Sequence, residues 1–159
     1  MSPQEYEILL VEDDPADAEL TLISLRKEGL ANHIEVARDG AEALDYIFCR
    51  GKYSARTFAK SPRLVLLDLQ LPKISGHDVL RTIKSDERTK AIPVVVLTSS
   101  NHQRDLVQCY QLGVNSYIQK PVDLQKFQEV ARHLGMYWLV INEAPPEVAV
   151  GSGAQGADK

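Results

Sequence analysis

Three acidic residues follow two apolar segments of the sequence, in positions where they could bind a cation. Glu12 and Asp13 come directly after Ile8-Leu9-Leu10-Val11, and Asp68 ends Leu64-Val65-Leu66-Leu67-Asp68. Both segments have the length and composition of buried strands. If these strands are parallel neighbours, their carboxyl ends meet at one edge of a sheet, and so do the three carboxylates. Two such charges about 4 Å apart repel by about 4 kcal/mol at an effective dielectric of about 20, so the cluster needs a cation, a proton or a lysine.

A hard divalent cation with oxygen ligands satisfies this requirement, and Mg²⁺ fits best where it keeps water molecules and shares a phosphate group. Helix capping is the competing explanation for acidic residues in these positions. It accounts well for Asp14, which precedes Pro15 at the expected start of a helix. It does not account for Asp68, because Leu69-Gln70-Leu71-Pro72 follows it and is no helix start.

Two further polar residues follow later apolar segments. Thr98 ends the strand expected at 93–98, and Lys120 follows the strand expected at 114–119. A hydroxyl and an ammonium group at the same edge can bind an oxyanion. Three carboxylates, one Mg²⁺ and one lysine have no net formal charge, so the site can accept the added charge of a phosphoryl group. A cis peptide bond before Pro121 would aim the lysine inward.

Apolar segments and amphipathic segments alternate along the whole chain, which is the pattern of five strand–helix units. The first helix is expected over 15–27, with Ala16, Leu20 and Ile23 at helical spacing, and the last from Asp123 to about Ile141. The other helices are expected to start after the capping residues Asp39, Ser75 and Asn101. The five expected strands are 8–11, 34–37, 64–68, 93–98 and 114–119.

This alternation predicts an α/β fold with a doubly wound, five-stranded parallel sheet. The third and fourth strands are almost wholly apolar, as parallel strands covered on both faces are. The second is more polar and is expected at an edge. Right-handed crossovers then favour the strand order 2-1-3-4-5, in which the first and third strands are neighbours at the switch point.

The pattern resembles the receiver domain of bacterial two-component response regulators, a flavodoxin-like fold. The resemblance spans nearly the whole chain. Its matching elements, in order, are Glu12-Asp13, Asp68 in Leu67-Asp68-Leu69-Gln70-Leu71-Pro72, Ser75-Gly76, Thr98-Ser99, Tyr117 and Lys120-Pro121. Glu12 stands where many receivers have Asp. The long loop at 52–62 and the aromatic C-terminal helix resemble the subgroup associated with bacterial phytochrome kinases.

The resemblance implies a role for each matching residue. Asp68 would accept a phosphoryl group from a sensor histidine kinase, for which the subgroup resemblance suggests a bacteriophytochrome. Glu12, Asp13, Asp68 and the carbonyl of Gln70 would organise Mg²⁺. Residues from the fourth and fifth strands would complete the site: Thr98 and Lys120 would bind the phosphoryl oxygens, while Thr98 and Tyr117 would move as a switch. The protein would be a signalling phosphoacceptor and not an enzyme in the usual sense.

Composition restricts the partners and the compartment. The 159 residues carry a formal net charge of −4, so the chain lacks the basic field typical of nucleic-acid binding. No apolar run is long enough to span a bilayer, and the polar N-terminus is no signal peptide. Cys49 and Cys109 are isolated, as expected of reduced thiols in a cytoplasmic protein.

The charged loop residues Lys52, Arg56 and Lys60 are expected to be solvated, with a partner contact as the alternative.

We expect a receiver domain over residues 1–142, acting without an output domain, and a C-terminal tail over 143–159 that is mobile or ordered by a partner. In the last helix, Leu124, Phe127, Ala131, Leu134 and Trp138 form one core-facing stripe. The segment 136–141 is apolar on all sides, so it is expected either to pack deeply or to form a homodimer contact. The predicted dimer interface comprises Tyr137, Trp138 and Val140.

Two other functions fit the same fold. A Mg²⁺-dependent phosphohydrolase with an aspartate nucleophile, of the dehalogenase-like type, would need a second acid two residues after Asp68, where Gln70 stands. A flavodoxin-type cofactor binder would need a phosphate-binding turn after the first strand, and the sequence has none there. Both are therefore disfavoured.

Overall fold

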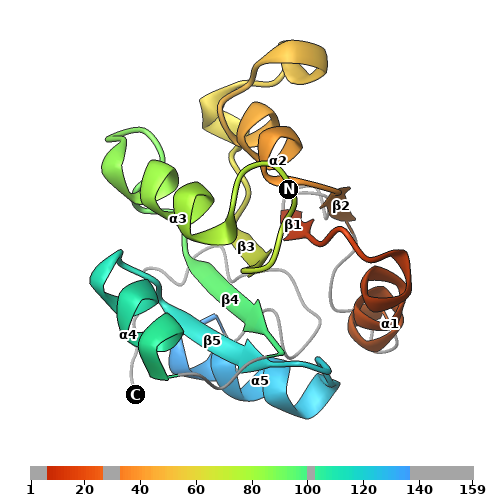
Figure 1. Cartoon of the computed structure of the whole chain (residues 1–159). Helices are drawn as coiled ribbons and strands as arrows, with labels where there is room; N and C mark the ends of the chain where they lie inside the picture. The colour runs from red at the N-terminus through yellow and green to blue at the C-terminus, as the bar shows by residue number, and fades with distance from the viewer. Residues whose placement is uncertain (1–6, 27–32, 100–102, 137–159) are drawn as a thin grey trace, which may run out of the picture.

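In the computed structural model (Figure 1), five parallel strands form one sheet with the order β2-β1-β3-β4-β5. The structure describes residues 7–26, 33–99 and 103–136. The predicted fold class and strand order are confirmed, with the polar second strand at an edge. The strands are β1 (Glu7–Val11), β2 (His33–Ala37), β3 (Leu64–Asp68), β4 (Val94–Thr98) and β5 (Ser116–Gln119).

In the described part of the chain, five α-helices cover the two faces of this sheet (Figure 1). One hydrophobic core cluster contains residues of α2, α3 and α4, and the cluster on the other face contains residues of α1 and α5. None of the described helices is long and apolar enough to cross a membrane. The helices are α1 (Pro15–Arg26), α2 (Gly40–Ile47), α3 (Gly76–Ser85), α4 (Gln103–Gln111) and α5 (Leu124–His133).

The two central strands β3 and β4 are buried along their whole length. Successive side chains of a strand point to opposite faces. Accordingly, Val65 and Leu67 join the core cluster under α2 and α3, while Leu64 and Leu66 join the cluster under α1 and α5. Because both faces are covered by helices, both sets are apolar, and this explains the unbroken apolar runs in the sequence.

The predicted helix starts are confirmed at four capping residues. The carboxylate of Asp14 accepts a hydrogen bond from the amide of Ala16 at 2.8 Å. Asp39, Ser75 and Asp123 each accept one from the amide three residues later, at 2.7, 3.2 and 2.8 Å. Each side chain satisfies an amide that the first helical turn leaves without a backbone acceptor. The remaining predicted cap, Asn101, lies outside the described residues.

The helix α1 packs against the sheet with other residues than the apolar ones that indicated it in the sequence. Leu20 and Ile23 are 57% and 54% exposed, whereas Ala18 and Leu25 are buried in the core. The helix has apolar residues on two faces at helical spacing, so periodicity could not tell which face packs against the sheet. Ala16, Leu20 and Ile23 correctly indicated a helix, but their spacing does not mark the face that packs against the sheet.

The last helix ends earlier than the sequence predicted. The helix α5 ends at His133 and does not continue to Ile141. Gly135 has a φ of 78°, in the left-handed region that glycine adopts at helix ends. The predicted stripe is confirmed within the described residues, since Phe127 and Ala131 are buried and Leu124 and Leu134 pack against them.

The segment between α2 and β3 is a loop with two short 3₁₀ turns, Gly51–Tyr53 and Phe58–Lys60. One of its basic residues is not a solvated charge. The guanidinium of Arg56 donates to the carbonyl oxygens of Tyr46 and Lys60, and it stacks on the Tyr46 ring at 3.6 Å from the ring centroid. Arg56 thus fixes the loop to α2.

Candidate functional site

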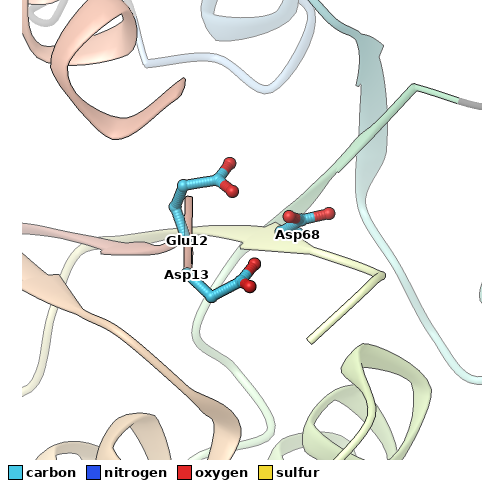
Figure 2. Close-up of side chains that lie close together, drawn as sticks. All are labelled: Glu12, Asp13 and Asp68. Carbon is cyan, nitrogen blue, oxygen red and sulfur yellow. The ribbon is translucent and has the colours of Figure 1, made fainter. Parts of the chain in front are cut away.

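The three predicted carboxylates meet at the carboxyl edge of the sheet (Figure 2). Glu12, Asp13 and Asp68 each offer an oxygen atom, and these three atoms lie within 4.8 Å of one another. Glu12 and Asp68 are 1% and 4% exposed, whereas Asp13 is exposed. The cluster therefore has a buried interior and one side open to solvent.

Strand register brings these residues together. Val11 of β1 pairs with Leu67 of β3, so the residues that follow each of them lie at the same level of the sheet. The chain after β1 stays attached to its other neighbour as well, because the amide of Glu12 donates to the carbonyl of Ala37 at 2.9 Å. Two adjacent parallel strands thus present their first polar residues side by side.

The loop after Asp68 turns tightly around its carboxylate. The amide of Gln70 donates to Oδ1 of Asp68 at 3.1 Å, and the amide of Gly76 donates to the carbonyl of Leu69 at 3.1 Å. A Cβ atom on Gly76 would lie 2.5 Å from the carbonyl oxygen of Asp68 and from the Cα of Leu69. Only glycine permits this approach. Gly76 is therefore required because α3 begins so close to the end of β3.

Lys120 joins the cluster from the end of β5. Its ammonium nitrogen lies 2.8 Å from Oε1 of Glu12 and 3.1 Å from Oδ2 of Asp68. The amide of Lys120 donates to the carbonyl of Thr98 at 2.8 Å, which ties the ends of β4 and β5 together. The peptide bond between Lys120 and Pro121 is cis.

Burial and charge shift the protonation of this cluster. Burial raises the pKa of Glu12 to about 7, because contact with Lys120 only partly offsets the loss of water and the charge of Asp68 adds to the effect. Burial lowers the pKa of Lys120, but the carboxylates of Glu12 and Asp68 outweigh it and hold this pKa above its ordinary value. One lysine therefore does not neutralise the acidic cluster.

The residues present fit a divalent cation. Oε1 of Glu12 is buried and has no aligned hydrogen-bond donor among the described residues, although the ammonium of Lys120 is near. The atoms available to bind a cation are carboxylate and carbonyl oxygens, which are the ligands that Mg²⁺ and Mn²⁺ prefer. An ion bound by Glu12, Asp13 and Asp68 would supply the positive charge that these residues lack.

The two remaining strand residues have different environments. Thr98, the last residue of β4, is 3% exposed, and it pairs in register with Gln119, next to Lys120. Tyr117 lies on the edge strand β5 and is 39% exposed. Thr98 thus lies at the same edge as the acidic cluster, while the ring of Tyr117 is accessible to solvent.

The predicted dimer residues Tyr137, Trp138 and Val140 lie outside the described residues, as does the tail 143–159. One residue at the site was missed by sequence reasoning. Oδ2 of Asp17, in the first turn of α1, lies 3.2 Å from the ammonium of Lys120. Its position just after Glu12-Asp13 was a usable signal, because α1 starts at the same edge of the sheet.

Comparison with known proteins assigns a family. Residues 8–132 match the family described as "Response regulator receiver domain". The chain is 44% identical to the "Probable methanogenesis regulatory protein FilR2" of Methanothrix harundinacea, over 87% of this chain and 86% of that protein. It is 37% identical to the "Response regulator Rcp1" of Synechocystis sp., over 83% of this chain and 88% of that protein.

Solved structures agree with this assignment. The "bacteriophytochrome response regulator AtBRR" superposes with a TM-score of 0.77 at 50% identity, covering 84% of this chain and 94% of that one. Rcp1 in its "Mn(2+)-bound form" superposes with a TM-score of 0.71 at 35% identity, covering 89% and 99%. A structure with this fold thus holds a divalent metal ion.

Proposed function

The chain belongs to the response regulator receiver-domain family, and we propose that it signals by accepting a phosphoryl group on Asp68 from a phosphohistidine of a sensor histidine kinase. Members of this family are signalling phosphoacceptors and not enzymes that turn over a separate substrate. The observation that carries the proposal is the contact of the buried Asp68 with Lys120, beside the two acids Glu12 and Asp13.

The proposed transfer exchanges one bond for another. An Asp68 carboxylate oxygen forms a bond to phosphorus, and the bond from phosphorus to the histidine nitrogen breaks. The electron pair of the broken bond stays with the imidazole, which leaves and takes up a proton from water. Because the transferred group carries its charge on its oxygens, such chemistry depends on position and charge neutralisation more than on covalent help from the protein.

The site residues divide this work. Glu12, Asp13, Asp68 and the carbonyl of Gln70 would hold Mg²⁺, which when bound neutralises the carboxylates and the incoming oxyanion. The ammonium of Lys120 and the hydroxyl of Thr98 would bind phosphoryl oxygens. Glu12, with its longer side chain, would contact the ion through a water molecule.

We propose that Thr98 and Tyr117 carry the signal away from the site. Thr98 would move toward the new oxyanion, and the exposed ring of Tyr117 would then turn inward. This changes the surface formed by α4, β5 and α5. A local change in charge thereby selects one of two arrangements of a surface that a partner protein reads.

The proposed pathway is linked to a phytochrome. The likeness to the bacteriophytochrome response regulator AtBRR supports a bacteriophytochrome as the candidate kinase. The proposed compartment is the cytoplasm.

We also propose that the protein forms a homodimer through Tyr137, Trp138 and Val140. Light scattering of the wild type and of Trp138→Ala would test this proposal.

Phosphorylation of the purified protein by acetyl phosphate in Mg²⁺ tests the function directly. Intact-mass spectrometry should detect one added phosphoryl group on the wild type and none on Asp68→Asn. Addition of EDTA should also prevent the modification, because the carboxylates then lack the cation.

Asp78→Asn is the matched control, since it makes the same change of charge at an exposed position on α3. It should be modified like the wild type. Modification of Asp68→Asn to the same extent would show that the phosphoacceptor is another residue.

A further inference from the structure

Lys120 has a carboxylate partner that lies outside the cluster of three acids. Oδ2 of Asp17 accepts a hydrogen bond from its ammonium at 3.2 Å. We propose that Asp17 is a positioning residue that holds Lys120 in the unphosphorylated protein and competes with the phosphoryl group for it. This inference rests on the proposed function of Asp68, and it concerns how strongly that site retains its phosphoryl group.

The number of donors on Lys120 creates the competition. An ammonium group has three N–H donors. Two of them are used in hydrogen bonds, to Oδ2 of Asp68 at 3.1 Å and to Oδ2 of Asp17 at 3.2 Å. Oε1 of Glu12 lies 2.8 Å from the ammonium nitrogen as an ion-pair partner and occupies the remaining side. A phosphoryl oxygen can approach the ammonium only if one of these three carboxylates withdraws.

Burial decides which carboxylate withdraws. The side chain of Glu12 is 1% exposed and that of Asp68 is 6% exposed, so neither can exchange the ammonium for water. The side chain of Asp17 is 43% exposed. A carboxylate that loses a buried partner bears the full desolvation cost, whereas an exposed carboxylate is rehydrated. Asp17 is therefore the partner that a phosphoryl oxygen replaces.

The negative charge of Asp17 also opposes the binding of a phosphoryl group. Three carboxylates, one lysine and one divalent cation have no net formal charge, and Asp17 adds a fourth negative group. The phosphoryl group must both displace this carboxylate from Lys120 and stay near it once displaced. Because Asp17 is half exposed, its pair with Lys120 is a weak one. Its removal should strengthen phosphoryl binding by a small factor and leave the binding site intact.

Titration with beryllofluoride, a stable mimic of the phosphoryl group, measures this effect in the full-length protein. Mg²⁺ is kept saturating for each variant, as established by a separate Mg²⁺ titration. Asp17→Asn should lower the dissociation constant for beryllofluoride about threefold, as expected for loss of an exposed ion pair. Glu19→Gln makes the same change of charge at an exposed position two residues later on α1 and should leave the constant unchanged.

Each other outcome contradicts the inference in a recognisable way. Equal or weaker binding by Asp17→Asn would show that Asp17 does not compete for Lys120. Equal tightening by Glu19→Gln would assign the effect to overall charge. A role of Asp17 limited to stabilising α1 would lower the free energy of unfolding without moving the dissociation constant. If the wild type itself fails to bind beryllofluoride, the proposed function fails, and this inference fails with it.

Discussion

Two partly buried lysines lie at opposite ends of the sheet and have opposite surroundings. Lys120, at the carboxyl ends of the strands, contacts three carboxylates. Lys84, near the end of α3, donates to neutral oxygens at the other end: the carbonyls of Lys90 and Ile92 and the side-chain amide of Asn115, at 3.1, 2.7 and 3.0 Å. The described residues thus use the same side chain for two purposes.

The charge of the surrounding acceptors distinguishes the lysine of the site from the structural lysine. Burial lowers the pKa of Lys84, and no acid among the described residues counters this shift. Lys84 therefore holds α3 to the segments that precede β4 and β5. Its three N–H donors have three neutral acceptors, so the ammonium has no donor left to bind a ligand. At Lys120 the negative charges exceed the positive one, and this surplus of acceptors is what makes the edge able to take up a cation.

Replacement of Lys120 by Met should have the largest effect. It leaves the buried carboxylates of Glu12 and Asp68 without their only cationic partner among the described residues. Loss of one member of a buried ion pair should lower the free energy of unfolding by about 3 kcal/mol in EDTA. Saturating Mg²⁺ should restore much of this loss, because the ion neutralises the same carboxylates. Urea denaturation in EDTA and in Mg²⁺ measures both values.

Lys52→Met serves as the control, since Lys52 is 70% exposed and pairs with Glu42 at the surface. It should leave the free energy of unfolding nearly unchanged in either buffer, because an exposed ion pair contributes little. An equal loss in both buffers for Lys120→Met would mean that Lys120, like Lys84, only stabilises the fold and that the two lysines do not differ in role.

Replacement of Lys84 by Met should cost less and should not depend on Mg²⁺. The carbonyl of Ile92 loses a donor, while Oδ1 of Asn115 keeps its bond from the amide of Val94 at 2.8 Å. A buried acceptor left without a donor costs about 1–3 kcal/mol, and the part-buried position puts the expected loss near 1.5 kcal/mol. Urea denaturation in the same two buffers should give equal values. A Mg²⁺-dependent loss would show that this end of the sheet also senses the ion.

The sequence predicted the acidic edge better than the opposite one. Glu12, Asp13 and Asp68 stand directly after apolar strands, so parallel topology alone brings them together. Lys84 gave no such signal, because its partners are main-chain carbonyls and an asparagine from other segments. Contacts of that kind depend on how the helix packs against the sheet. Residue type and spacing do not predict this packing.

Helix orientation explains what was missed at the site itself. The contact of Asp17 with Lys120 depends on how α1 is rotated against the sheet, and α1 has apolar residues on two of its faces. Leu20 and Ile23 lie on the apolar face that is exposed, and Ala18 and Leu25 lie on the one that packs. Where a helix has a single apolar stripe, as α5 does at Phe127 and Ala131, the packed face was predicted correctly.

The helix-capping residue Asp39 is, in contrast to Glu12, a carboxylate whose acceptor oxygens are satisfied by hydrogen bonds. Hydrogen bonding from the amide of Glu42, with a smaller contribution from Lys73, holds the pKa of Asp39 below its ordinary value of 3.8. Burial instead raises the pKa of Glu12. Asp39→Ala should lower the free energy of unfolding by about 1 kcal/mol at neutral pH, the usual value of such a cap.

The pH dependence of this loss follows from the direction of the shift. A carboxylate with a depressed pKa in the folded state contributes stability above its unfolded pKa, and this contribution disappears as the pH falls through the folded value. The difference between wild type and Asp39→Ala should therefore be constant at neutral pH and shrink as the pH falls below about 3.8. Urea denaturation over this range measures it. A difference that grew toward low pH would mean that protonated Asp39 is the better cap, and that Asp39, like Glu12, is a carboxylate whose charge the fold does not satisfy.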